Sequence, residues 1–307
     1  MERKKGALVL VLDAGNALFK FSQAGADPTE KARAELLLKQ MDAMGTSAMA
    51  VGQRDLTLGL DYLKNGSKGL KMKLLSANLV DKAGKPVFPA STVLSAGGLK
   101  VGVIGASPEG TVSDLTGQPM VPAVLAEAKR LREKDKADVV VVLAAAPYDV
   151  VRKFAATAEG VDFVIQSHEG RGTGIAYRDG LATLLPSGER GRQIARLELS
   201  VDGPGQFRDL AAVGQAKDAL KNVEANLARA KERLAATKDE AARKALEETI
   251  TTFETRRAAL EKEAQADATG MARTHHLTYI QLGADAPSDP AVQKLVDRIE
   301  PPGSGGH

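Results

Sequence analysis

Apolar runs and helical repeats alternate along most of this chain. The runs at residues 7–12 (ALVLVL) and 138–143 (DVVVVL) are typical of strands buried on both faces of a sheet. Residues 28–44 instead repeat with helical spacing, and Gly45 marks the end of the predicted helix. The apolar side chains that share this helical face are Ala34, Leu37, Leu38, Met41 and Met44.

The rest of the pattern predicts strands and helices in alternation, which indicates an α/β fold. Further strands are predicted at residues 48–51, 74–78, 92–95, 100–105, 163–166, 174–178, 182–185, 195–201 and 276–282, and further helices at residues 56–63, 122–134 and 150–158. Turns at Gly97-Gly98 and Asp179-Gly180 join neighbouring strands into hairpins. We therefore expect a mixed sheet, or a second sheet packed on the first.

Residues 213–267 differ from the rest, because they contain no Pro and are dominated by Ala, Glu, Lys, Arg and Leu. Apolar residues step by four and three in two series, and each series indicates a helix with an apolar seam. Thr237 and Glu240 form a capping-box pattern, so the second helix is predicted to begin there. The seams comprise Ala216, Leu220, Val223, Leu227, Ala230 and Leu234, then Leu246, Ile250, Phe253, Leu260 and Ala264. We expect an antiparallel coiled-coil hairpin inserted between two strands, with seams that close within one chain or between two.

These patterns predict an α/β domain at residues 1–209, an inserted helical hairpin at 210–270, and a return strand with a terminal helix at 271–298. Residues 299–307 have the composition of a linker and are predicted to be disordered. Charged residues stand directly before the first strand, so we expect the natural start of the protein to lie upstream.

The amino-acid composition excludes several classes of function. The 307 residues include no Cys, which excludes disulfides, thiolate metal sites and cysteine nucleophiles together. Aromatic residues make up 4% of the chain, and the net charge of +3 arises from interleaved signs, so we expect no nucleic-acid partner. No segment approaches the ~18–20 apolar residues of a transmembrane helix.

Polar side chains follow the predicted strands, at the edge of the sheet where α/β proteins bind ligands. The strand at residues 48–51 is followed by an amide, a guanidinium, a carboxylate and a hydroxyl within a few positions. The ligand-binding candidates from this and other strand ends are Asp13, Arg54, Asp55, Asn78 and His168.

A hydrolytic metal site needs several convergent oxygen or nitrogen ligands, and here they would be Asp13, Asp55 and His168. We interpret His168 as a hydrogen-bonded loop residue, and Arg54 would repel a divalent cation in a poorly screened cleft. We therefore expect no metal or other cofactor, with Mn²⁺ or Zn²⁺ as the alternative. Arg54 is predicted to form a structural salt bridge with Asp13 or Asp55, or else to bind an anion such as phosphate.

Five blocks of sequence, in order, resemble the N-terminal metallophosphoesterase domain of the 5′-nucleotidase family, which has a calcineurin-like phosphoesterase fold. The blocks are residues 11–18 (VLDAGNAL), 50–59 (AVGQRDLTLG), 75–78 (LSAN), 100–105 (KVGVIG), and 139–145 with 161–170. The resemblance implies a sandwich of two mixed β-sheets flanked by helices, to which the coiled-coil hairpin is an addition. It also implies a periplasmic or cell-surface location, because the family acts mostly outside the cytoplasm.

The departures from the family pattern fall on its metal-binding and catalytic positions. Asn16 stands where the family has the Asp that bridges two metals, and Gln53 stands where it has an Asn ligand. Arg54 replaces the catalytic His, and Thr57 replaces the Asp partner of that His. Ala145 and Gly170 replace two further His. One ligand position is kept as His168, and the first family motif, Asp-x-His, would lie before residue 1. The resemblance therefore implies a degenerate metal site.

We expect a catalytically inactive phosphoesterase-like module used for binding or as a scaffold, with the hairpin as its protein-interaction arm. The partner-binding residues would be Leu220, Val223, Leu227, Leu234, Leu246, Ile250, Phe253 and Leu260. A homodimer through the coiled coil is a further expectation. The alternatives are a metal-dependent phosphoester hydrolase with a rebuilt site, and a phosphate- or nucleotide-binding module that uses Arg54.

Overall fold

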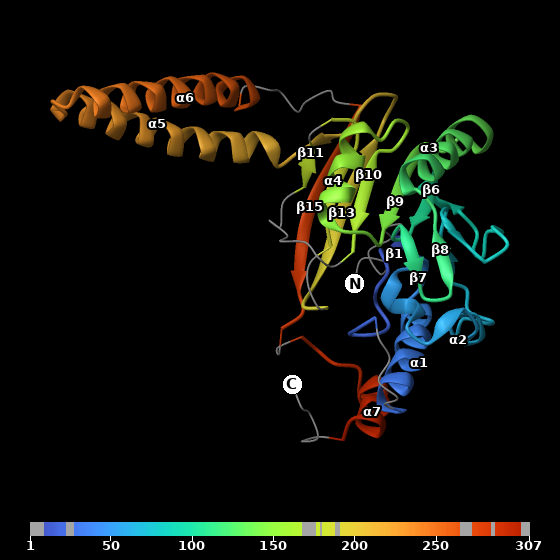
Figure 1. Ribbon diagram of the computed structural model, residues 1–307. Coiled ribbons are helices and arrows are strands. Elements are labelled where there is room, and N and C mark those ends of the chain that lie inside the picture. Colours follow the sequence, from blue (N-terminus) through green and yellow to red (C-terminus); the bar gives the residue numbers. More distant parts are fainter. Residues whose placement is uncertain are drawn as a thin grey trace. The chain divides into compact units, whose positions relative to one another are not determined.

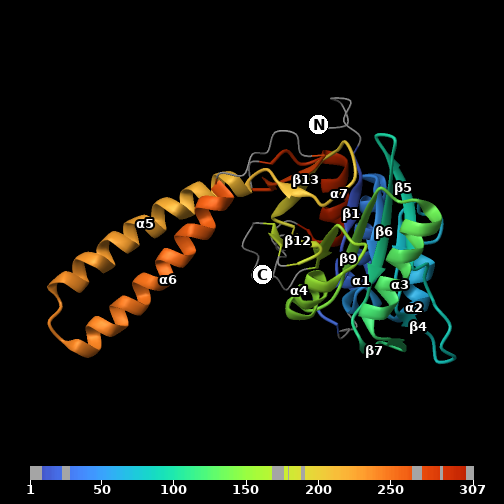
Figure 2. The same ribbon diagram turned by 90° about the horizontal axis from the view of Figure 1, so that it is seen from above.

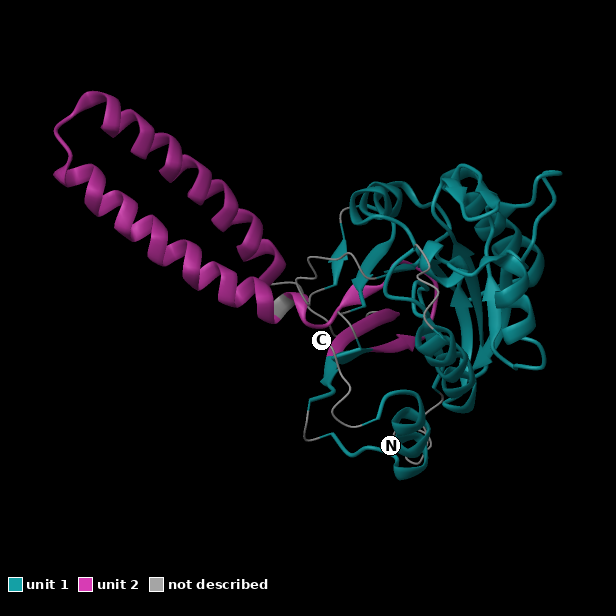
Figure 3. Ribbon diagram, turned by 60° about the horizontal axis from the view of Figure 1, so that its bottom comes forward, with its two compact units in different colours: residues 1–195, 279–307 teal, residues 196–278 magenta. Residues whose placement is uncertain are grey.

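The computed structural model describes residues 9–22, 28–167, 176–178, 180–187, 191–264, 272–283 and 286–301 (Figure 1). The chain divides into two compact units, formed by residues 1–195 with 279–307 and by residues 196–278 (Figure 3). The second unit includes strands as well as the two long helices. The boundaries predicted at residues 209 and 270 for a hairpin domain stay a prediction.

The first unit begins with three parallel strands and two helices. These are β1 (Val11–Asp13), α1 (Pro28–Ala43), β2 (Thr46–Ala50), the 3-10 turn η2 (Gln53–Leu56), α2 (Gly59–Gly66) and β3 (Lys73–Leu75). Strand β2 lies between β1 and β3, and its register pairs Met49 with Asp13 and Ala48 with Lys73. Leu38 of α1 and Leu63 of α2 are buried in one cluster with Met49, which explains why the helical repeat of residues 28–44 predicts α1 well.

The largest sheet has six strands in the order β11-β12-β10-β9-β6-β5. Its strands are β5 (Ser91–Ala96), β6 (Leu99–Ala106), β9 (Val139–Ala144), β10 (Phe163–Gln166), β11 (Tyr177–Arg178) and β12 (Thr183–Pro186). The four central strands are parallel, and β5 and β11 pair antiparallel with their neighbours, so the sheet is mixed. Gly97 and Gly98 both have positive φ in the turn from β5 to β6, as the predicted hairpin requires.

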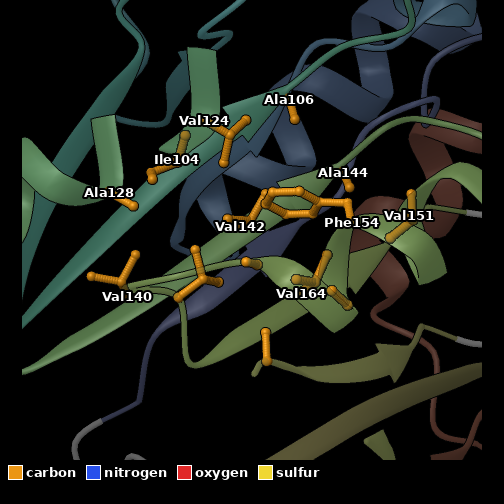
Figure 4. Packing of buried hydrophobic residues seen from close by; sticks show 14 of the residues in the cluster. Ile104, Ala106, Val124, Ala128, Val140, Val142, Ala144, Val151, Phe154 and Val164 are labelled. Carbon is orange, nitrogen blue, oxygen red and sulfur yellow. The ribbon is translucent and has the colours of Figure 1, made fainter. Parts of the chain in front are cut away.

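Every residue of β9 is buried, which confirms the prediction of a strand covered on both faces. One face packs against α3 (Met120–Arg130), its π-helical continuation η3 (Leu131–Asp135) and α4 (Tyr148–Thr157). Phe154 of α4 lies against Val142 and Ala144 in this core (Figure 4). The other side of the sheet contacts β2, so two sheets are layered between two sets of helices.

Small sheets and one terminal helix complete the fold. Strands β4 (Leu79–Val80), β7 (Gly110–Val112) and β8 (Leu115–Gly117) form a three-stranded sheet, and α7 (Pro290–Ile299) contacts α1 next to an ion pair between Arg33 and Glu300. The described residues therefore contain four sheets, whereas two were predicted. One reason is that the strand predicted at 74–78 ends at Leu75, where Ser76 Oγ accepts the N–H of Leu79 at 3.0 Å and turns the chain.

The second unit is built around a pair of long helices. Its strands are β13 (Gln193–Val201), β14 (Arg208–Asp209) and β15 (Arg273–Gln281), in the order β13-β15-β14. Helices α5 (Ala212–Ala236) and α6 (Glu240–Ala264) follow β14 and run side by side in opposite directions (Figures 1 and 2). Helices were therefore predicted correctly in both segments.

The apolar seams of α5 and α6 face each other. Leu227, Ala230 and Ile250 are buried between the helices, with Leu234 and Phe253 packed against them. Among the described residues of both helices, no large hydrophobic side chain is exposed. Four of the residues predicted to bind a partner, Leu227, Leu234, Ile250 and Phe253, pack within the hairpin itself, which removes apolar surface from water. Their role in binding a partner stays a prediction.

The cap of α6 differs from the prediction. Asp239 Oδ2 accepts the N–H of Ala242 at 2.8 Å, whereas Thr237 Oγ1 donates to the carbonyl of Arg233 at 2.7 Å. The Thr237 hydroxyl therefore serves the end of α5, and the predicted capping box is wrong. In the part of the chain that the structure describes, no helix is both long enough and apolar enough to cross a membrane.

Candidate functional site

The C-terminal ends of the parallel strands bring most of the predicted polar residues together. Asp13 ends β1, the turn η2 follows β2, and Ser76 follows β3. Ser107 follows β6, and its Oγ lies 2.5 Å from the Val51 carbonyl oxygen and 2.8 Å from Ser76 Oγ. The edge predicted from the sequence therefore exists, and hydrogen bonds link its two sheets.

Asp55 is fully buried and accepts hydrogen bonds from backbone N–H groups at four positions. Oδ2 accepts from Asn16 at 2.7 Å and Gly52 at 2.8 Å. Oδ1 accepts from Ala17 at 2.8 Å and Leu18 at 3.1 Å. Both carboxylate oxygens thus accept hydrogen bonds from the backbone, and Asp55 holds the loop after β1 against η2.

Burial raises the pKa of Asp55 to about 6, against the opposing effect of the backbone N–H groups. The nearby charge of Asp13 adds to the increase. Burial also raises the pKa of Asp13, while the hydrogen bond from Gly15 N–H to Oδ1, at 2.8 Å, lowers it. Both carboxyls therefore lie in surroundings that disfavour negative charge.

Arg54 forms no ion pair with Asp13 or Asp55 within the described residues, so the predicted structural salt bridge is wrong. Its Nη1 donates to the carbonyl of Lys20 at 3.1 Å, and its backbone N–H donates to Asn16 Oδ1 at 3.0 Å. Its Nε is buried without an acceptor in the described residues. The salt bridge fails because backbone N–H groups already satisfy Asp55.

Asn78 is buried and hydrogen-bonded to two other segments of the chain. Its Nδ2 donates to the carbonyls of Ser107 and Gln118, both at 2.9 Å. Its Oδ1 accepts the N–H of Ser107 at 2.9 Å. The side chain is buried and both ends of its amide are hydrogen-bonded within the protein, and ligand binding by Asn78 stays a prediction.

Two of the substituted family positions, Asn16 and Thr57, carry side chains that hydrogen-bond to the protein. Asn16 Nδ2 donates to Ser167 Oγ at 3.0 Å. Thr57 Oγ1 lies 3.0 Å from the Phe21 carbonyl oxygen and 2.9 Å from that of Arg54. Gln53 is exposed, and Ala145 is buried. His168 and Gly170 lie outside the described residues.

Residues 76, 107 and 167 are serines that did not appear among the predicted site residues. Each follows a strand directly, which is the signal that identifies Asp13. Their hydroxyls link strand ends to one another, so they belong to the scaffold of this edge.

Among the described residues, which do not include His168, the polar side chains at this edge offer few free ligands to a divalent metal. Within the described ranges, no group of three or more His, Asp or Glu side chains could hold an ion. Asp13 offers one oxygen beyond its bond to Gly15, Asp55 offers none, and the guanidinium of Arg54 lies at the same edge. A hydrolytic site would need several free ligands around one ion.

Comparison with known proteins agrees with the resemblance. No family model matches the chain. A 5′-nucleotidase of Vibrio vulnificus is 32% identical over 108 residues, which are 35% of this chain and 19% of that protein. A 5′-nucleotidase of Vibrio cholerae is 29% identical over 150 residues, which are 45% of this chain and 26% of that protein. The chain thus matches about a quarter or less of these relatives' length.

Solved structures show the same fold. A Thermus thermophilus sulfate thiohydrolase superposes with a TM-score of 0.56 at 22% identity, over 64% of this chain and 37% of that one. A 5′-nucleotidase precursor from Thermus thermophilus superposes with a TM-score of 0.54 at 20% identity, over 66% and 44%. This chain therefore shares its fold with both of these proteins. The chain is thus similar in sequence to 5′-nucleotidases over part of its length, and it shares its fold with a solved 5′-nucleotidase precursor.

Proposed function

We propose that this chain is a metallophosphoesterase-fold module without hydrolytic activity, which acts in binding or as a scaffold. The observation that supports the proposal is the use of polar atoms at the strand ends. The polar side-chain atoms of Asp55, Asn16 and Asn78 form hydrogen bonds within the protein. Arg54 adds a positive charge at the same strand ends, which would repel a metal ion. Water activation by a metal is the chemistry that such hydrolases depend on.

Metal content of the purified chain tests this proposal. The protein is incubated with Mn²⁺ and Zn²⁺, desalted, and measured by elemental analysis, and hydrolysis of nucleoside monophosphates is assayed in parallel. We expect well under one equivalent of metal, about a tenth or less, and no turnover above a metal-only blank. One or two equivalents with turnover would instead support a hydrolase built from Asp13, Asp55 and His168.

A second candidate function is the binding of phosphate or a phosphorylated ligand through Arg54. The observation in its favour is that Arg54 Nε is buried without an acceptor in the described residues, since a buried N–H that lacks an acceptor costs roughly 1–3 kcal/mol. Phosphate should then raise the melting temperature of the chain, and Arg54→Lys should abolish the effect. Arg33→Lys is the matched control, because Arg33 pairs with Glu300 away from the strand ends.

We also propose that α5 and α6 form a coiled coil that meets a protein partner, or a second copy of the chain, through their outer faces. The seam is closed, so contact would involve charged residues such as Lys217, Lys244 and Glu248, which are exposed. A periplasmic or cell-surface location is part of the same proposal, and fractionation of the native cells tests it.

A further inference from the structure

A strongly basic segment lies at the end of the first unit that is remote from the candidate site. Residues 64–73 (KNGSKGLKMK) contain four Lys and no Asp or Glu. All four side chains are exposed, and within the described residues none of them takes part in an ion pair. Their charge is therefore available to a partner. The four are Lys64, Lys68, Lys71 and Lys73.

Tertiary contacts place this segment beside the end of α1. Asp42 Oδ1 accepts the N–H groups of Lys71 at 2.7 Å and Met72 at 2.8 Å. A Cβ at Gly66 would lie 3.2 Å from Leu38 Cδ1, so the end of α2 also packs on α1. The carboxylate of Asp42, the acidic group that meets the segment, is thereby occupied by backbone N–H groups.

The end of α1 adds apolar surface to these charges. Met44, which follows α1 directly, is 63% exposed, and Leu37 on the same helical face is 36% exposed. The register of β2 and β3 pairs Ala48 with Lys73, so Lys73 lies where these parallel strands begin, and Lys71 lies just before β3. We name Lys64, Lys68, Lys71, Lys73 and Met44 the basic face.

The basic face and the candidate site lie at opposite ends of the same parallel sheet. Asp13, η2 and Ser76 stand at the C-terminal ends of β1, β2 and β3, whereas Lys73 starts β3. A surface bound to the basic face would leave the candidate site directed away from it.

We propose that the basic face binds the surface of membranes that contain anionic lipids. Lysine ammonium groups act as point charges that suit a diffuse negative surface, whereas recognition of single phosphates favours the planar fork of arginine, which the face lacks. Exposed Met44 offers a side chain to the headgroup boundary, and residues 64–73 contain no aromatic side chain to stack on bases. These features favour a lipid surface over a nucleic acid.

Co-sedimentation of the full chain with vesicles tests the proposal. Vesicles of phosphatidylglycerol mixed with phosphatidylcholine are compared with vesicles of phosphatidylcholine alone, at low and high salt. We expect binding to the anionic vesicles, loss of binding at high salt, and no binding to the neutral ones. The double variant Lys68→Gln/Lys71→Gln should bind about 25-fold more weakly, at about fivefold per lysine, which corresponds to about 1 kcal/mol for each basic residue near the surface.

A matched variant keeps the net charge equal. Lys153→Gln/Lys294→Gln removes two exposed lysines, one in α4 and one in α7, that form no ion pair in the described residues, and it should bind like the unaltered chain. Met44→Ser should weaken binding by up to about tenfold without changing the charge. Circular dichroism verifies that each variant is folded.

Three results would overturn the proposal. The unaltered chain could fail to bind anionic vesicles at low salt, or the two double variants could lose binding equally. Duplex DNA could also bind the same lysines more tightly than the vesicles do and displace the chain from them, which would make the basic face a nucleic-acid surface.

Discussion

The backbone N–H of Asn16 donates a 2.7 Å hydrogen bond to Asp55 Oδ2, across 39 positions of sequence. The N–H groups of Ala17 and Leu18 reach the other oxygen of the same carboxylate. This contact fixes the loop after β1 to η2 through the backbone. Because these donors are backbone N–H groups, the hydrogen bonds to Asp55 do not themselves depend on the side-chain chemistry of Asn16.

Replacement of Asp55 should destabilise the fold. Asp55→Ala would leave several buried N–H groups without an acceptor, and we expect a loss on the order of 3–5 kcal/mol in the free energy of unfolding. Asp61→Ala, at an exposed position in α2, is the control and should change it by less than about 0.5 kcal/mol. Urea unfolding followed by circular dichroism measures both. Equal stabilities of the two variants would mean that water replaces the carboxylate without cost.

Stability should depend on pH through Asp55. Burial raises its pKa from 3.8 to about 6, so the folded chain holds a proton that the unfolded chain releases between about pH 4 and 6. The contribution of this group to the free energy of unfolding is therefore fully present below about pH 4 and is lost as pH rises through about 6. Asp13, whose pKa burial also raises, acts in the same direction.

The comparison of wild type with Asp55→Asn isolates this dependence, since asparagine does not titrate. The stability of the wild type relative to this variant should fall by up to about 3 kcal/mol from about pH 4 to about pH 7. Urea unfolding across this range is the measurement. A difference that grows with pH would show that the backbone N–H groups outweigh burial and lower the pKa.

The close approach of Gly52 to Asn16 leaves no space for a methyl group. A Cβ at Gly52 would lie 2.3 Å from Asn16 Oδ1, and the Asn16 amide is held by Arg54 N–H and Ser167 Oγ. Gly52→Ala should therefore cost about 1–3 kcal/mol and shift the amide resonances of the loop after β1. Gly214→Ala in α5, where a Cβ meets no atom within 4 Å, should be neutral or stabilise by up to about 1 kcal/mol.

The closed seam of α5 and α6 makes a separate prediction. Ile250 is 9% exposed between the two helices, so Ile250→Ala should destabilise the helical pair by about 2–4 kcal/mol. Thr252→Ala, two positions along and exposed, should have little effect. Hydrogen exchange should locate the loss of protection in α5 and α6. If Ile250→Ala instead converted a dimer to a monomer, the seam would be shared between chains.

Local sequence patterns determined most of the elements. The run of residues 138–143 predicted β9, because a strand buried on both faces is apolar at nearly every position. Two seam series predicted α5 and α6, because burial of one helical face repeats with a period near 3.6 residues. The strand-end polar residues also identified the correct edge, since the carboxyl ends of parallel strands meet at one edge of a sheet.

Only the tertiary structure decided what those polar residues do. The Asn78 side chain hydrogen-bonds to residues that lie 29 and 40 positions away in the sequence. The Asp55 carboxylate accepts hydrogen bonds from N–H groups up to 39 positions away. The basic face likewise depends on the docking of Lys71 beside Asp42. Periodicity reports which side of an element is buried, but hydrogen-bond partners are set by how distant segments pack, and that information is absent from any local stretch of sequence.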